Sequence, residues 1–187
     1  MYGIYLRPLV PGRGPDLPPG YSSRTFDEDD AEALFACADN PALGLTASFV
    51  RAALAKGDAC DAVLHHGKVV AYDWLAFSAT HDSEGVYVDF GKTDRYGYKA
   101  FTLPEYRGKH LRRVPRSNDY CIARGVTHVI SFVDVTNRSS IRSTIGRGSV
   151  RIGFAGYLKR GRVFVPFRTP AVRRRGFRFF VPRDAAV

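Results

Sequence analysis

The sequence predicts a mixed α/β domain whose central sheet is mostly antiparallel and flanked by helices. Three observations lead to this fold class. Apolar runs of strand length recur along the 187 residues, and tight turns at His66-Gly67 and Arg160-Gly161 join neighbouring runs into hairpins. The stretch at 46–56 repeats apolar side chains at helical spacing. A strand of buried type at 127–135 stands between two helical segments, an order that places helices on both faces of a sheet.

The first part of the chain is expected to contain strands, two helices and a hairpin. Acidic side chains follow Asp27, where they favour the positive end of a helix dipole, and Gly57 is suited to close the second helix. Prolines and glycines between residues 8 and 19 indicate a linker. The expected elements are strands at 2–10 and 21–26, helices at 27–40 and 46–56, and hairpin strands at 59–65 and 68–77.

The second part is expected to alternate strands and helices before a closing hairpin. Pro115 falls inside one expected helix and would remove a hydrogen bond there, so we expect a kink. Asn137 is the expected cap of the next helix. The expected elements are strands at 84–90 and 96–103, a helix at 111–124, a strand at 127–135, a helix at 139–145, and strands at 150–158 and 162–167. The expected domains are an extension at 1–19, the main domain at 20–167 and a basic segment at 168–187.

The charge of the chain is strongly uneven. Residues 1–99 hold 9 Lys and Arg against 14 Asp and Glu, a net charge of −5, whereas residues 100–187 hold 19 against 4, a net charge of +15. A basic half of this kind indicates an anionic partner such as a phosphorylated cofactor, a nucleic acid or an acidic lipid. Charge by itself does not choose among these partners.

Composition excludes several other classes. No apolar stretch approaches the ~20 residues that a transmembrane helix needs. The cysteines, Cys37, Cys60 and Cys121, are odd in number and far apart, which is typical of free thiols in a reducing compartment. No spacing of Cys and His suggests a metal site. We therefore expect a cytoplasmic protein without a metal, and the sequence leaves a homodimer open.

The segment at 101–125 carries the strongest signal for function. A strand ends at Leu103, Pro-Glu-Tyr interrupts it, and Arg107-Gly108-Lys109 leads towards a helix, whose N-terminus would offer backbone N–H groups to a pyrophosphate. Asn137 follows the next strand, and Gly148 lies 11 residues after it. This pattern resembles the GNAT superfamily of N-acetyltransferases over about residues 21–158, with the diagnostic motifs at 98–150. The residues that match in type and spacing are Pro104, Tyr106, Arg107, Gly108, Asn137, Ser140 and Gly148.

The resemblance implies that acetyl-CoA or another acyl-CoA is the co-substrate. Ala100, Phe101 and Thr102 would pair through their backbone with the pantetheine arm, and Asn137 would hydrogen-bond near its end. The pyrophosphate turn would consist of Arg107, Gly108, Lys109, His110, Leu111, Arg112 and Arg113. The reaction implied is direct attack of an amine on the thioester, with the strand amide near Thr102 polarising the carbonyl.

The sequence also departs from the family pattern. His110 and Arg112 replace two glycines of the turn, so they either point outwards and add positive charge or occlude the phosphate site. Thr144 stands where many members carry a tyrosine general acid, and its hydroxyl has too high a pKa for that role. Phe132 replaces a frequent glutamate, and Ser149 replaces a phenylalanine.

Three residues remain as candidate catalytic groups. Asp134, in an otherwise apolar strand, could deprotonate the amine, or it could be a strand-end residue that faces water or caps the next helix. Asp89 and Tyr98 lie on strands that flank the substrate cleft in the family, and alternation would aim one face of each strand inwards.

The leading hypothesis is therefore an N-acyltransferase, with acetyl as the expected acyl group and a small-molecule or peptide amine as acceptor. An aminosugar, a polyamine, a protein N-terminus and a small antibiotic all remain open. The main alternative is a non-catalytic module that binds acyl-CoA or nucleic acid through the basic half.

The segment at 167–183 interleaves Arg and Phe. This pattern is typical of RNA-binding or membrane-surface segments, and also of a terminal strand with one solvated face. Peripheral membrane contact stays open, and nucleic acid is the less favoured partner.

Overall fold

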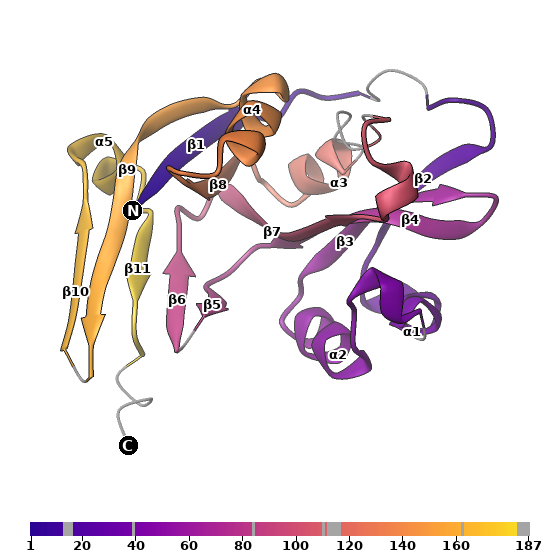
Figure 1. The fold of residues 1–187 in the computed structure, drawn as a ribbon, viewed down its shortest axis with the longest axis horizontal. Helices are drawn as coiled ribbons and strands as arrows, with labels where there is room; N and C mark the ends of the chain where they lie inside the picture. Colours follow the sequence, from indigo (N-terminus) through magenta and orange to yellow (C-terminus); the bar gives the residue numbers. More distant parts are fainter. Residues whose placement is uncertain are drawn as a thin grey trace. The chain divides into compact units, whose positions relative to one another are not determined.

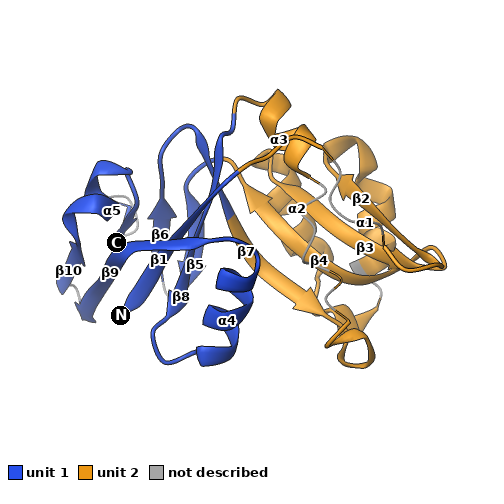
Figure 2. Ribbon diagram, turned by 90° about the horizontal axis from the view of Figure 1, so that it is seen from above, with its two compact units in different colours: residues 1–8, 78–96, 126–187 blue, residues 9–77, 97–125 orange. Residues whose placement is uncertain are grey.

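A computed structural model describes residues 1–12, 17–38, 40–83, 85–109, 111, 117–161 and 163–182. The chain forms two compact units, coloured separately in Figure 2. Unit 1 comprises residues 1–8, 78–96 and 126–187, and unit 2 comprises residues 9–77 and 97–125. The predicted division into 1–19, 20–167 and 168–187 follows other boundaries and stays a prediction. No helix among the described residues is long and apolar enough to cross a membrane.

The strands form one large sheet and one small sheet (Figure 1). The order of hydrogen-bonded strands in the large sheet is β10-β9-β1-β8-β7-β4-β3-β2, and that in the small sheet is β11-β6-β5. Strand β7, Asp94–Thr102, belongs to unit 1 up to Tyr96 and to unit 2 from Gly97. Its pairing with β8 is parallel, whereas the ladders of β1, β2, β3, β9 and β10 are antiparallel. The mixed, mostly antiparallel sheet predicted from the sequence is confirmed.

Unit 2 contains an antiparallel sheet covered by helices. Its elements are β2 (Tyr21–Phe26), α1 (Ala31–Ala38), α2 (Ala47–Ala55), β3 (Ala59–His65), β4 (Lys68–Ala76), α3 (Asn118–Ala123) and the short 3-10 helices Glu28–Asp30, Pro41–Leu43 and Pro104–Tyr106. Helices α1 and α2 lie on one face of the sheet and α3 on the other (Figure 1). Trp74 and Tyr72 are buried between sheet and helices, and the hydroxyl of Tyr72 donates to the carbonyl of Leu43 at 2.7 Å.

Unit 1 contains two sheets around an aromatic core. Its elements are β1 (Tyr2–Pro8), β5 (Thr80–Ser83), β6 (Val86–Asp89), β8 (His128–Asp134), α4 (Arg138–Gly146), β9 (Val150–Arg160), β10 (Val163–Arg168), α5 (Pro170–Arg174) and β11 (Arg178–Phe180). Phe132 of β8 lies at the centre of the core. Its ring contacts Tyr2 at 4.9 Å, Tyr96 at 5.6 Å and Phe179 at 5.2 Å between centroids. Strand β1 pairs with both β8 and β9, so the N-terminal strand is an inner strand of the sheet.

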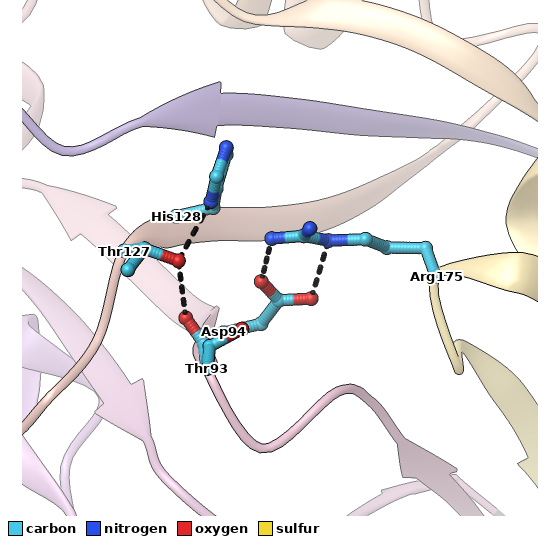
Figure 3. A network of polar contacts seen from close by, with 5 residues as sticks. All are labelled: Thr93, Asp94, Thr127, His128 and Arg175. Atoms are coloured by element: carbon cyan, nitrogen blue, oxygen red, sulfur yellow. Dashed lines mark hydrogen bonds and ion pairs between the residues drawn. The ribbon is translucent and has the colours of Figure 1, made fainter.

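The C-terminal segment folds back onto unit 1. Arg175 donates from Nε and Nη2 to the carboxylate of Asp94 on β7, and Arg178 forms an ion pair with Asp89 of β6 at 2.7 Å. Figure 3 shows the pair of Asp94 and Arg175 beside Thr93, Thr127 and His128. The side chains of Phe177 and Phe179 are buried. The terminal strand that the sequence left open as one interpretation of residues 167–183 is present as β11, whereas α5 was not predicted.

Three sequence-based elements need correction. The helix predicted at 111–124 is described only as Asn118–Ala123, and residues 112–116 lie outside the description. The strand predicted at 84–90 is Val86–Asp89, and its partner β5 was missed. The strand predicted at 96–103 is β7, Asp94–Thr102, so it begins two residues earlier than expected.

Candidate functional site

The second half of β7 is the strand edge on which the predicted co-substrate would lie. The parallel ladder of β7 with β8 covers residues 94–96, and within unit 2 the residues from Gly97 onwards form the edge next to β4. Lys99 has a φ of 43°, which interrupts the regular strand, and both Lys99 and Ala100 are exposed. Backbone groups of such an edge are available to an extended ligand that carries amides.

A turn with two cationic side chains follows this edge. The amide of Leu103 donates to the carbonyl of Val70 at 3.0 Å, which fixes the end of β7 to β4. Arg107 Nε donates to the carbonyl of Thr102 at 3.2 Å and so folds back over the strand end. Gly108 has a φ of +77°, and no atom of a described residue lies within 4 Å of the position that a Cβ would take. The turn therefore has the open backbone that close approach of a phosphate needs.

Aromatic side chains from β2 and β3 lie beside the turn. The ring of His65 stacks on Tyr21 with centroids 4.3 Å apart, and its Nδ1 lies 3.1 Å from the hydroxyl of Tyr106. Lys109 Nζ lies 4.8 Å from the centroid of Tyr106 and 3.4 Å from the hydroxyl of Tyr21. Desolvation, with His66 and Lys109 nearby, lowers the pKa of His65. Sequence reasoning missed Tyr21 and His65, because strand pairing brings them next to a turn more than 40 residues away in the chain.

Among the predicted turn residues, Arg107, Gly108, Lys109 and Leu111 are described, and Leu111 is buried in the core of unit 2. Ala100, Phe101 and Thr102 precede them on β7. His110, Arg112 and Arg113 lie outside the described residues. The expectations for these three side chains, including occlusion of the phosphate site, therefore stay predictions.

Asn137 caps α4, as predicted from the sequence. Its side-chain oxygen accepts from the amide of Ser140 at 3.1 Å and from the hydroxyl of Ser139 at 2.9 Å. The oxygen is thus engaged in the cap, which leaves the amide nitrogen for the predicted contact with pantetheine. Asn137 is exposed and lies in unit 1.

Asp134 ends β8 and accepts two hydrogen bonds from Thr136. Its Oδ1 lies 2.6 Å from the Thr136 hydroxyl and 2.8 Å from the Thr136 amide. These hydrogen bonds lower the pKa of Asp134, because they stabilise the ionised carboxylate. A carboxylate with a lowered pKa is a weaker base, so this environment favours the strand-end interpretation over proton abstraction.

Asp89 and Tyr98 are also engaged. Asp89 Oδ2 accepts from Arg178 Nε at 2.9 Å, which joins β6 to β11. The hydroxyl of Tyr98 donates to Oδ2 of Asp58 at 2.5 Å, and Lys56 Nζ lies 2.9 Å from the same oxygen. Burial raises the pKa of Asp58, although Tyr98 and Lys56 act in the opposite direction. Asp58 was not predicted as a site residue, and a carboxyl group that is buried beside a tyrosine is a candidate proton acceptor.

Two of the positions at which the sequence departs from the family pattern are buried or packed. Thr144 lies on α4 and is 4% exposed. Phe132 belongs to the aromatic core of unit 1, with its ring stacked on Tyr96. Neither side chain supplies an acid or a base.

Comparison with known proteins gives a likeness in fold. No family model matches the chain, and no curated protein matches it significantly. A solved Drosophila protein is 14% identical, with 80% of this chain and 47% of that chain covered and a TM-score of 0.51. An acetyltransferase of the GNAT family from Streptococcus pneumoniae is 12% identical, with 87% and 99% covered and a TM-score of 0.49. YncA of Salmonella typhimurium, a putative acetyltransferase solved with its cofactor acetyl-CoA, is 14% identical, with 90% and 97% covered and a TM-score of 0.45.

The chain spans between about half and three fifths of the length of the first structures that it matches. At these identities the likeness concerns the fold alone. Several of these structures are themselves described as GNAT proteins, the superfamily whose motifs the sequence resembles.

Proposed function

We propose that the chain is an N-acyltransferase that moves an acyl group, with acetyl as the first choice, from acyl-CoA to an amine. One observation carries the proposal: a strand edge at 99–102, exposed at Lys99 and Ala100, leads into the turn at Gly108, between the cations Arg107 and Lys109. An edge strand suits the amides of pantetheine, and the turn suits its pyrophosphate. Acyl-CoA is also the co-substrate expected for a GNAT fold.

The proposed reaction is direct transfer. The amine nitrogen attacks the thioester carbonyl carbon, the carbon–sulfur bond breaks, the attacking nitrogen loses a proton and the departing thiolate gains one. The edge strand would hold the acyl arm extended, and Arg107 and Lys109 would balance the phosphate charge. Tyr98 with Asp58 is the pair best placed by its chemistry to accept or deliver a proton, because a hydroxyl there already donates to a buried carboxylate. The acceptor remains open.

The test compares two glycines of the same geometry. Gly108 and Gly125 both have a φ of +77°, and within the described part of the chain no atom lies within 4 Å of a Cβ added at either position. Asp tolerates this region of backbone space better than most residues. We expect CoA to raise the Tm of the wild type and of Gly125→Asp, since a ligand that binds the native state stabilises it. Gly108→Asp should bind CoA at least tenfold more weakly, about 1.4 kcal/mol, because its carboxylate repels phosphate.

The neutral variant Gly108→Asn separates charge from bulk, and it should keep more of the affinity than Gly108→Asp. A wild-type protein whose Tm does not respond to millimolar CoA would refute the proposal. Equal affinity of Gly108→Asp and Gly125→Asp would instead place the phosphate elsewhere.

A second candidate is a GNAT-like module that binds acyl-CoA without catalysis. The observation in its favour is that each predicted catalytic side chain already has a structural partner: Asp134 has Thr136, Asp89 has Arg178, and Tyr98 has Asp58. Release of free CoA thiol in the presence of a panel of amines separates the two candidates. CoA binding without thiol release from any amine favours the module.

A further inference from the structure

A groove of about 600 Å³ lies on unit 1 where β10, α5 and β11 meet. This volume falls within the roughly 300–1,000 Å³ of sites that bind small molecules. All of its lining residues belong to the last quarter of the chain, in the region where Figure 1 shows β10 and β11 below α5. The lining residues are Phe164, Pro166, Phe167, Arg168, Arg173, Arg178, Phe179, Phe180 and Val181.

The charge of the groove is positive and only partly balanced. Arg178 is paired with Asp89, and Arg168 donates from Nη1 to the carbonyl of Phe177 at 2.8 Å. Arg173 is exposed, and its side chain makes no hydrogen bond or ion pair with a described residue. Residues 150–182 hold nine Lys and Arg and no Asp or Glu. The groove is therefore complementary to an anion that can take bidentate hydrogen bonds.

The rest of the lining is aromatic. Phe179 is buried and packs against Tyr157 with centroids 5.3 Å apart, and Phe164 contacts the same Tyr157 ring at 5.3 Å. Phe167 is 44% exposed, so a large part of its surface is open to a ligand. Phe167 is therefore the ring of the lining on which a planar base can stack.

We propose that this groove binds a nucleotide, with its base against the phenylalanine rings and its phosphate on Arg173 and Arg168. A flat bilayer surface would not fill a recess, and an acidic peptide would not use the aromatic lining. The combination of arginines and phenylalanines in one groove therefore favours a planar base joined to a phosphate. Free nucleotides and single-stranded RNA carry the same unit, and the experiment distinguishes them. The proposal does not depend on the acyltransferase function.

Two adjacent arginines provide a matched pair of variants. Arg173 lines the groove, whereas Arg174 does not; both are exposed side chains of α5. Substitution by Ser removes the same charge from the same helix. Binding of ADP and of a labelled ten-nucleotide RNA is measured by calorimetry and fluorescence anisotropy at fixed salt. We expect Arg173→Ser to weaken binding of at least one probe tenfold or more and Arg174→Ser to weaken it less than twofold. Phe167→Leu should also weaken binding, because stacking on an aromatic ring contributes about 1–3 kcal/mol per base.

The two probes distinguish a free nucleotide from an RNA strand as the ligand. Binding of ADP identifies a site for free nucleotides, whereas binding of RNA alone identifies a site for a strand. CoA itself carries an adenosine diphosphate, so binding of ADP is also measured for Gly108→Asp, and we expect Arg173→Ser to weaken it more than Gly108→Asp does. The proposal is wrong if neither probe binds, or if the two arginine variants lose binding equally, which would indicate general attraction to a basic surface. It is also wrong if anionic phosphatidylserine vesicles bind in a manner dependent on Arg173 while both nucleotide probes fail to bind.

Discussion

The pair of Asp94 and Arg175 is the clearest target for perturbing unit 1. Arg175 lies between α5 and β11, and its guanidinium donates to both carboxylate oxygens of Asp94 on β7 (Figure 3). Asp94 is also held locally, since its amide donates to the carbonyl of Gly91 at 2.9 Å. Replacement of Arg175 by Ala would leave a buried carboxylate without its counter-ion and would release the C-terminal segment from β7.

The size of the expected loss of stability follows from the burial of Asp94 and Arg175. The Asp94 side chain is 0% exposed and that of Arg175 is 27% exposed. Removing one partner of a buried pair costs about 3–5 kcal/mol. Because water already reaches part of Arg175, we expect the lower end, about 3 kcal/mol. For a chain of this size this corresponds to a fall in Tm of roughly 6–12 °C.

The loss should depend on pH in a defined direction. Burial raises the pKa of Asp94 above its usual value, and Arg175 opposes that rise. The folded state therefore favours the protonated carboxyl. The carboxyl of Asp94 contributes its full stabilisation at pH values below the pKa that it has in the unfolded chain. This contribution is lost as the pH rises through the pKa that Asp94 has in the folded protein. Without Arg175 the folded pKa rises further, so the penalty of Arg175→Ala should be largest near neutral pH. It should shrink as the pH approaches the ordinary Asp value of about 3.9.

Urea unfolding at several pH values measures this effect, with Arg174→Ala as the control. Arg174 is the exposed residue before Arg175 in the chain, and surface substitutions of this kind usually change stability by about 0.5 kcal/mol or less. Equal losses for the two variants would refute the reasoning. So would a loss for Arg175→Ala that stays constant between neutral and acidic pH.

Two further predictions concern the two units separately. In unit 1 a Cβ at Gly153 would lie 2.1 Å from Thr169 Oγ1, so Gly153→Ala should destabilise the protein by about 1–3 kcal/mol. The control Gly97→Ala, where no atom lies within 4 Å of the added Cβ, should change the Tm little, and equal Tm values would contradict this interpretation. In unit 2 Tyr98→Phe removes a hydrogen bond to the carboxylate of Asp58, and urea unfolding at neutral pH should register a loss of about 1.5–3 kcal/mol. The reasoning fails if Tyr98→Phe is as stable as the wild type.

The elements that the sequence predicted well are those with local signals. Thr46 accepts from the amide of Phe49 and begins α2, as a cap at that position requires. The turn at His66-Gly67 joins β3 and β4, where His66 has a φ of 48° and Gly67 one of 78°. Asn137 caps α4. Each of these signals lies within a few residues of the element that it defines. Such an element can therefore be predicted without knowing which strands pair in the sheet.

The features that were missed depend on pairing across long stretches of sequence. Strand β1 enters the sheet between β8 and β9, and β11 pairs with β6 through Phe179 opposite Val88. Asp94 and Arg175 are 81 positions apart. A short run such as Arg178–Phe180 has no hydrophobic period that would identify its partner, and only the packed core decides the register. The aromatic side chains next to the proposed phosphate turn were missed for the same reason.

The basic C-terminal segment shows why net charge alone did not identify a partner. Of the five arginines at 168–178, Arg175 and Arg178 form ion pairs with acids of the same unit, and Arg168 donates to a backbone carbonyl. Much of the charge that the sequence shows as an excess thus holds the segment against the sheet. Arg173 and Arg174 are left for an external anion, and of these Arg173 faces the groove. A phosphate site in this segment must therefore depend on position rather than on total charge, and this is why neighbouring arginines can be expected to behave differently.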